Sequence, residues 1–144
     1  MRLALAGKGG AGKTTLSATL ARLEARRGAR VVAIDADSNP NLGVALGLSP
    51  EVAAQATSLP FSLVSRRING PALTAPIPEV LDKYALTCPD GVSLVVMGGP
   101  GHAEEGCLCS AHATVAALLV ELGETPEATA VIDLEASPEH LSRG

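Results

Sequence analysis

The sequence predicts an α/β fold in which a mainly parallel sheet is flanked by helices. Short apolar runs at 2–6, 30–34, 92–97 and 129–134 have the length of buried strands, and several are rich in β-branched residues. Helical patterns lie between the first two runs and between the last two, the second of these at 111–122. Strand, glycine-rich turn, helix and strand in that order form the right-handed βαβ unit of a parallel sheet.

The first βαβ unit is the best defined part of the chain. Residues 2–6 form a strand that ends at Gly7, and a helix is expected from Lys13 to Arg27. Gly28 ends this helix, because glycine tolerates a positive φ angle. The next strand, 30–34, leads into two aspartates, Asp35 and Asp37. Leucines at spacings of four and three predict the buried face of the helix, namely Leu16, Leu20 and Leu23.

The middle of the chain gives weaker signals. Ser49 followed by Pro50 indicates a helix start, and Pro78 opens a short helix that runs through Tyr84. Residues 57–78 are rich in Pro, Ser and Gly, and we expect a loop there. No internal repeat or linker divides the chain, so residues 1–144 are interpreted as a single domain.

Composition excludes several classes of protein. With 47% hydrophobic and 18% charged residues, the chain has the composition of a globular domain. No apolar run approaches the roughly 18 residues of a membrane span, and the N-terminus lacks the pattern of a signal peptide. The net charge of −4 gives no basic face for nucleic acid. The three cysteines do not form a disulfide framework, so we expect a cytoplasmic protein with reduced thiols.

A phosphate-binding loop follows the first strand. Gly7, Gly12, Lys13 and Thr14 fit the Walker A pattern GxxxxGK[ST], placed between a strand and a helix as its chemistry requires. The backbone N–H groups and the helix dipole would face the phosphates, Lys13 would contact the β- and γ-phosphates, and the Thr14 hydroxyl would bind Mg²⁺. A P-loop NTPase fold that binds ATP and Mg²⁺ is therefore predicted. The expected nucleotide-binding residues are Gly7, Lys8, Gly9, Gly10, Ala11, Gly12, Lys13, Thr14 and Thr15.

A second lysine in this loop, Lys8, resembles the one that defines the deviant Walker A ATPases, a group that includes MinD, ParA, the nitrogenase iron protein and metal-insertion ATPases. The resemblance implies a homodimer formed with ATP, in which Lys8 reaches the nucleotide of the partner. It also implies that Lys8 and Lys13 act in catalysis and that Asp37 positions or activates the attacking water. Asp133 looks like the Walker B acid that holds Mg²⁺ beside Thr14, and the segment after it looks like switch II. Aspartates at strand ends are also common helix caps, an alternative that applies most strongly to Asp35.

A cysteine pair, Cys107 and Cys109, precedes the last predicted helix. Two thiolates one residue apart can hold half of a Zn²⁺ or Ni²⁺ site, and a two-fold dimer would supply the other half. The alternative is that both are small buried apolar residues. His112 is either a further ligand or a polar residue on the helix surface, whereas Cys88 is expected to be an ordinary core or loop thiol.

The chain as a whole resembles the CooC-type nickel-insertion ATPases that mature carbon monoxide dehydrogenase. Five stretches carry the resemblance in the family's order: GKGGAGKTT, AIDADSNPNLGVALG, IPEVLDKY, VVMGGPGHAEEGCLC and VIDLEASPEHLSRG. It implies ATP hydrolysis coupled to delivery of Ni²⁺ into apo carbon monoxide dehydrogenase or acetyl-CoA synthase, with Cys107 and Cys109 as metal ligands. Members of the family are longer, so we expect the N-terminal part of their fold, with an open sheet edge and about four strands.

Three other interpretations compete with this one. A nitrogenase-type iron protein would need a second cluster cysteine just after Asp133, and the sequence has none there. A MinD- or ParA-like positioning ATPase would have no use for the cysteine pair. A nucleotide-binding fragment without activity is compatible with all the motifs.

Overall fold

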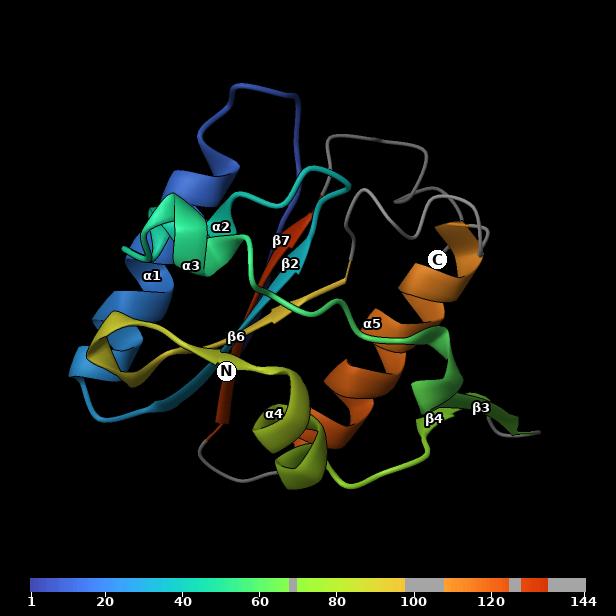
Figure 1. The fold of residues 1–144 in the computed structure, drawn as a ribbon. Helices are drawn as coiled ribbons and strands as arrows, with labels where there is room; N and C mark the ends of the chain where they lie inside the picture. Colours follow the sequence, from blue (N-terminus) through green and yellow to red (C-terminus); the bar gives the residue numbers. More distant parts are fainter. Residues whose placement is uncertain (68–69, 98–107, 125–127, 135–144) are drawn as a thin grey trace.

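The computed structural model describes residues 1–67, 70–97, 108–124 and 128–134 (Figure 1). The strands are β1 (Arg2–Leu5), β2 (Arg30–Ala36), β3 (Val64–Arg67), β4 (Gly70–Leu73), β5 (Leu86–Thr87), β6 (Ser93–Val96) and β7 (Ala128–Leu134). The α-helices are α1 (Lys13–Arg26), α2 (Leu42–Ala45), α3 (Pro50–Ala53), α4 (Ile77–Tyr84) and α5 (Leu108–Glu124). Two 3₁₀ turns, η1 (Phe61–Leu63) and η2 (Pro89–Gly91), complete the described elements.

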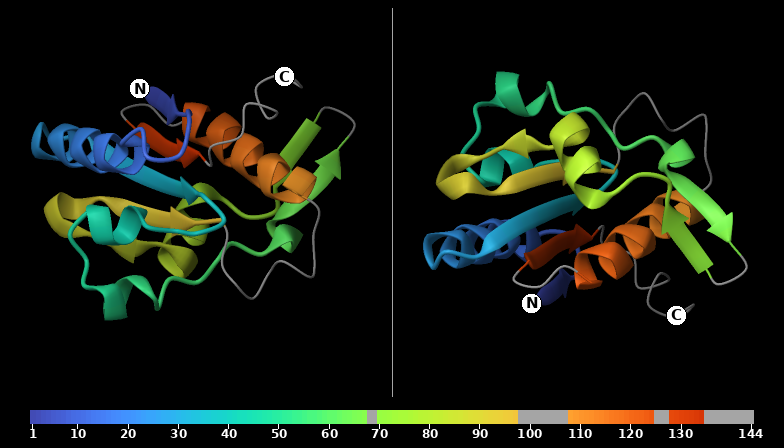
Figure 2. Two further views of the ribbon diagram at one scale, coloured as in Figure 1. Left: turned by 90° about the horizontal axis from the view of Figure 1, so that it is seen from above. Right: turned by 90° about the horizontal axis from the view of Figure 1, so that it is seen from below.

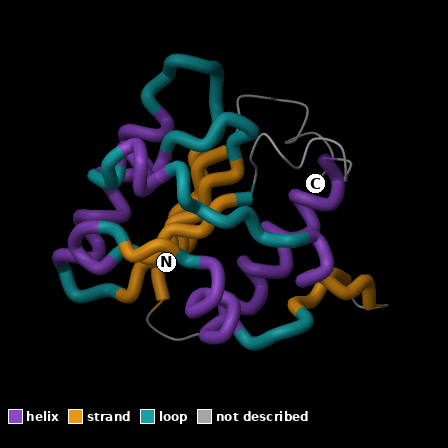
Figure 3. The backbone as a smooth tube through the Cα atoms, viewed as in Figure 1, coloured by secondary structure: helices purple, strands orange, loops and turns teal. Residues whose placement is uncertain are grey.

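The main sheet has five strands in the order β1-β7-β2-β6-β5. β1, β7, β2 and β6 are parallel, and the two-residue strand β5 pairs antiparallel to β6. All four strands expected from the apolar runs are present, which confirms the mainly parallel α/β fold. The strands cross the centre of the molecule between its helical layers (Figure 3).

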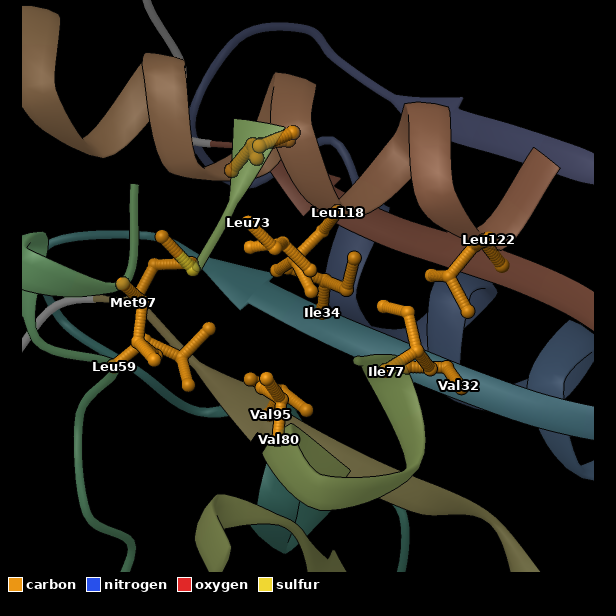
Figure 4. Packing of buried hydrophobic residues seen from close by; sticks show 14 of the residues in the cluster. Val32, Ile34, Leu59, Leu73, Ile77, Val80, Val95, Met97, Leu118 and Leu122 are labelled. Atoms are coloured by element: carbon orange, nitrogen blue, oxygen red, sulfur yellow. The ribbon is translucent and has the colours of Figure 1, made fainter. Parts of the chain in front are cut away.

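Helices cover both faces of this sheet, and the alternation of side chains along β2 assigns the residues to them. Val31 and Ala33 lie in one apolar core with α1 and α2, whereas Val32 and Ile34 lie in the other. The second core is closed by α4, α5 and the β3–β4 hairpin, and Figure 4 shows Leu118 and Leu122 of α5 close to these two β2 residues. Figure 2 shows the same arrangement from above and below. The sheet is therefore the middle layer of three.

The helix after the phosphate loop forms as expected, but the prediction of its buried face is wrong for Leu16 and Leu23, whereas Leu20 is half-buried. Leu16 is 51% exposed and Leu23 is 41% exposed. The residues that face the sheet are instead the small ones, Ser17, Ala18 and Ala21. Small side chains allow α1 to pack closely against β7 and β2. The helix is therefore packed on the sheet through Ser17, Ala18 and Ala21 and not through a row of leucines.

The expectation of a loop at 57–78 is also wrong in part. Strands β3 and β4 form a separate antiparallel hairpin with Val64 opposite Leu73. Four-residue strands that contain Gly70 and Pro71 resemble a loop in sequence. Leu63 and Leu73 are buried in the core beneath α5, and this tertiary packing holds the hairpin in place. The short helices expected at Ser49 and Pro78 are confirmed by α3 and α4.

One edge of the sheet is open. Among the described residues β1 has a strand partner on one side only, which is β7. Burial along β1 alternates between exposed and half-buried. The other outer strand of the described sheet is the two-residue β5, which pairs with β6 alone.

Candidate functional site: a phosphate loop and three carboxylates at one sheet edge

The loop between β1 and α1 has the backbone of an anion site. Gly10 and Gly12 have φ angles of +78° and +81°, in the left-handed region that favours glycine. Gly12 is the N-cap of α1, and because glycine has no side chain, the first N–H groups of the helix keep their approach to an anion open. The Lys13 ammonium lies 3.5 Å from the Lys8 carbonyl oxygen, so its side chain folds back over the loop.

Asp133 lies near the end of β7, buried beneath this loop. Asp133 is 1% exposed, and its carboxyl group accepts a 3.4 Å hydrogen bond from the hydroxyl of Ser17 on α1. Ser17 is itself fully buried and sits one helical turn after Thr14. The sequence analysis missed Ser17, although its position one turn beyond the Walker A threonine was a usable signal.

Asp35 and Asp37 lie at the end of β2. Asp35 is fully buried, and its two carboxyl oxygens accept hydrogen bonds from the backbone N–H groups of Asp37 (3.2 Å) and Leu42 (2.8 Å). Burial raises the pKa of Asp35 to about 6, although these two hydrogen bonds act in the opposite direction. Asp37 is half-buried and accepts a 2.9 Å hydrogen bond from the N–H of Asn39.

Strand register places these groups at one edge of the sheet. Leu5, the last residue of β1, pairs with Asp133, and Asp133 pairs on its other side with Asp35. Parallel strands end at the same edge, so the phosphate loop, Asp133 and the Asp37 segment meet there. In Figure 1 the blue loop that precedes α1 stands above the arrowheads of β7 and β2. Hard oxygen donors from Thr14 and Asp133 are the ligand type that Mg²⁺ prefers.

The predicted thiol site lies largely outside this description. Cys107 is outside the described residues, and Cys109 is the second residue of α5, with its side chain and that of His112 also outside them. Cys88 is buried, and burial raises the pKa of its thiol to about 11, which confirms the expectation of an ordinary core thiol. Within the part of the chain that the structure describes, no three His, Cys, Asp or Glu residues gather as a metal site.

A cavity of about 340 Å³ adjoins the Asp37 segment. It lies between α2, α3 and the ends of β2 and β6, and no sequence pattern predicted it. Its walls include Asp35, Asn39, Pro40, Gly43, Leu94 and Val96.

None of the described helices is long and apolar enough to cross a membrane.

Comparisons with known proteins agree with this geometry. A family described as the CobQ/CobB/MinD/ParA nucleotide binding domain matches residues 3–137. The carbon monoxide dehydrogenase accessory protein CooC of Rhodospirillum rubrum is 38% identical over all of this chain and 58% of its own length. Two uncharacterized ATP-binding proteins of Methanocaldococcus jannaschii are 30% and 32% identical over 99% of this chain, covering 58% and 56% of their own lengths. The chain thus spans little more than half the length of these relatives.

Proposed function

Because the chain belongs to the CobQ/CobB/MinD/ParA nucleotide binding domain family, we propose that it is an ATP-hydrolysing maturation factor of the CooC type. One observation carries the proposal: the register Leu5–Asp133–Asp35 brings the phosphate loop and the carboxylates to one sheet edge. The similarity to the Rhodospirillum rubrum accessory protein over the whole chain supports carbon monoxide dehydrogenase as the client, and the related acetyl-CoA synthase is the alternative client.

The phosphate loop is proposed to bind the triphosphate of ATP. The N–H groups of Gly9 to Thr15 and the N-terminus of α1 would face its oxygens, and Lys13 would contact the β- and γ-phosphates. Thr14 and Asp133 would hold Mg²⁺, which neutralises phosphate charge when it is bound. The Ser17 hydroxyl donates a hydrogen bond to the Asp133 carboxyl group and helps to hold it in place.

Asp37 is proposed to orient the water that attacks the γ-phosphorus. A new bond forms from the water oxygen to phosphorus, and the bond from phosphorus to the bridging oxygen of ADP breaks. The hydrogen bond from Asn39 to the Asp37 carboxylate holds that side chain at the end of β2. Lys8 lies on the exposed part of the loop, where a lysine of one subunit can reach a nucleotide bound by a second.

The cysteine pair is proposed to carry the metal. Cys109 stands in the first turn of α5, the helix that follows β6 in the order of the chain. In an ATP-bound homodimer two copies of Cys107 and Cys109 would complete a four-thiolate site for Ni²⁺ or Zn²⁺. ATP hydrolysis would then open the dimer and release the metal to the client.

Nucleotide binding and turnover test the ATPase part of the proposal. We expect Lys13→Ala to weaken ATP binding measured by calorimetry and to abolish phosphate release. Lys83→Ala is the matched control, because Lys83 stands over the ring of Tyr84, on α4, and should change neither quantity. Equal binding by both variants would contradict the assignment of the phosphate loop.

Metal stoichiometry tests the thiol part. With ATP present, we expect one Ni²⁺ or Zn²⁺ per dimer in the wild type, and none in a variant with both Cys107→Ser and Cys109→Ser. Cys88→Ala removes a buried thiol and should keep the metal. Lys8→Ala should keep nucleotide binding but lose the ATP-dependent dimer in analytical ultracentrifugation.

A MinD- or ParA-like positioning ATPase is the second candidate, because the matching family also includes these proteins. Such an ATPase would act at a membrane or on DNA and would not need the thiol pair. ATP-dependent sedimentation with anionic liposomes or with DNA, unchanged by the Cys107→Ser and Cys109→Ser substitutions, would favour it over metal delivery.

A further inference from the structure

The segment that carries Asp37 is closed by one buried side chain. Residues 37–41 follow the end of β2 and lead to Leu42, the first residue of α2. The Asp35 carboxyl group meets both ends of this segment: Oδ1 accepts the N–H of Asp37 at 3.2 Å, and Oδ2 accepts the N–H of Leu42 at 2.8 Å. A single carboxyl group therefore spans the base of the loop.

The rest of the loop depends on this closure. Asp37 accepts the N–H of Asn39 at 2.9 Å, and the Asn41 amide donates to the carbonyl oxygen of Asn39 at 2.8 Å. Both are local hydrogen bonds within residues 37–41, and neither runs to a residue of the sheet. Asp35, in contrast, is 0% exposed and is held in β2. The backbone N–H of Met97 donates a 2.8 Å hydrogen bond to the backbone carbonyl oxygen of Asp35.

Strand register connects Asp35 to the nucleotide side of the site. Its Cα atom is the partner of Asp133 on β7, and Asp133 accepts the hydroxyl of Ser17 on α1, the helix that begins at the phosphate loop. The loop that Asp35 closes therefore starts from a fixed point beside the proposed magnesium ligand.

We propose that Asp35 is a positioning residue for Asp37: its two hydrogen bonds hold the segment 37–41 so that the Asp37 carboxylate stays beside the phosphate loop. Asp35 itself touches neither nucleotide nor water in this role. The role rests on the proposed function, because it concerns the placement of the residue that orients the attacking water. It assigns to the first aspartate of the Asp35-Ala36-Asp37 sequence a purpose different from that of the second.

Two variants of Asp35 separate its two hydrogen bonds from its bulk. Asp35→Ala removes both acceptors, whereas Asp35→Asn keeps one side-chain oxygen and can accept one of the two N–H groups. Asp90→Ala is the matched control, because it removes two ion pairs from α1 at η2, a turn between β5 and β6 that is remote from this loop in the sequence.

Amide hydrogen exchange of the full chain, followed by NMR without nucleotide, tests the positioning directly. We expect Asp35→Ala to speed exchange at Asp37 and Leu42 by about tenfold or more, with the β7 amides unchanged, since a local hydrogen bond is lost without global unfolding. Asp35→Asn should show a smaller increase at one of the two amides, and Asp90→Ala none at either. Unchanged exchange at Asp37 and Leu42, or an equal increase throughout the chain, would overturn the proposal.

Turnover gives a second readout that a purely structural role would not produce. In Asp35→Ala we expect kcat for ATP to fall by about 10- to 100-fold, because a misplaced catalytic group loses its alignment, while the Kd for ATP changes less than about twofold. Asp35→Asn should recover part of the loss in kcat. Parallel losses in kcat and ATP affinity would contradict positioning. If the wild-type chain shows no turnover, the proposed function fails, and the exchange experiment still decides the role of Asp35.

Discussion

Asp35 and Asp133 stand next to each other on adjacent parallel strands, with their Cα atoms in register. The hydrogen bonds of both carboxyl groups run to the same helical layer, from Ser17 of α1 to Asp133 and from Leu42 of α2 to Asp35. Burial is the largest cause of the raised pKa of Asp35, and the charges of Asp133 and Asp37 add to it. Two acidic groups therefore share a small buried volume at the candidate site.

The raised pKa predicts how stability depends on pH. The pKa of Asp35 is about 6 in the folded chain and 3.8 ordinarily, so the folded state keeps a proton that the unfolded state releases. The contribution of Asp35 to the free energy of unfolding should therefore fall by about 2–3 kcal/mol as the pH rises from about 4 to 6, and then level off.

Urea unfolding between pH 4 and 7, without nucleotide or metal, measures this contribution. Asp35→Asn cannot ionise, so the difference between wild type and variant isolates the single group from the other carboxylates. An identical pH dependence of the free energy of unfolding in both proteins would contradict the raised pKa of Asp35.

Asp90 anchors the C-terminal half of α1 to the turn between β5 and β6. Its carboxylate lies 2.7 Å from Arg22 Nε and 3.1 Å from Arg26 Nε, and hydrogen bonds from Arg26 and Arg22 lower its pKa. Asp90 also has a φ of +62°, which asparagine tolerates. We expect Asp90→Asn to lower the Tm by about 2–4 °C, because it removes the charge and keeps the backbone.

Glu24→Gln serves as a comparison for Asp90→Asn, because it breaks only the exposed ion pair with Arg27 at the C-terminal end of α1. That variant should lower the Tm by less. The stabilising effect of Asp90 should be present above its ordinary pKa and should be lost as the pH falls through the lowered one. Equal Tm values for Asp90→Asn and wild type at pH 7 would show that the ion pairs do not anchor the helix.

The buried face of α1 predicts opposite responses to substitution at neighbouring positions. Ala21 is fully buried against the sheet, so Ala21→Leu should cost about 1–3 kcal/mol by overpacking. Leu23 is 41% exposed, so Leu23→Gln should change the free energy of unfolding by less than about 1 kcal/mol. Urea titration of both variants measures the two changes in the free energy of unfolding. A larger loss for Leu23→Gln than for Ala21→Leu would indicate that the leucine face of α1 is the buried one.

The Cys88 thiol should not react with alkylating reagents in the folded chain. Its burial and a pKa of about 11 keep the thiol protonated at pH 8, and thiolate is the reactive form. In a Cys107→Ser, Cys109→Ser background, where Cys88 is the remaining thiol, we expect no alkylation by iodoacetamide at pH 8 until urea unfolds the chain. Rapid alkylation without urea would indicate that the β5–β6 turn opens readily.

The phosphate loop and the flanking strands could be predicted because their signals are local. Glycines at fixed spacing and a lysine–threonine pair specify the loop, and short apolar runs specify the buried strands. The hairpin at Val64–Leu73 could not be predicted, because it depends on burial of Leu63 and Leu73 beneath α5, a helix 35 residues further along the chain. The role of Asp35 was ambiguous for a related reason, since a cap and a positioning group have the same sequence signature.

Residue order alone determined the position of the phosphate loop and of the four apolar runs that form β1, β2, β6 and β7, because these signals depend on neighbours within a few positions. Tertiary structure decided which face of α1 is buried, and it made Asp133 the neighbour of both Leu5 and Asp35. Such choices depend on how closely a helix approaches a sheet and on which strands pair, and both are set by contacts between residues far apart in the chain.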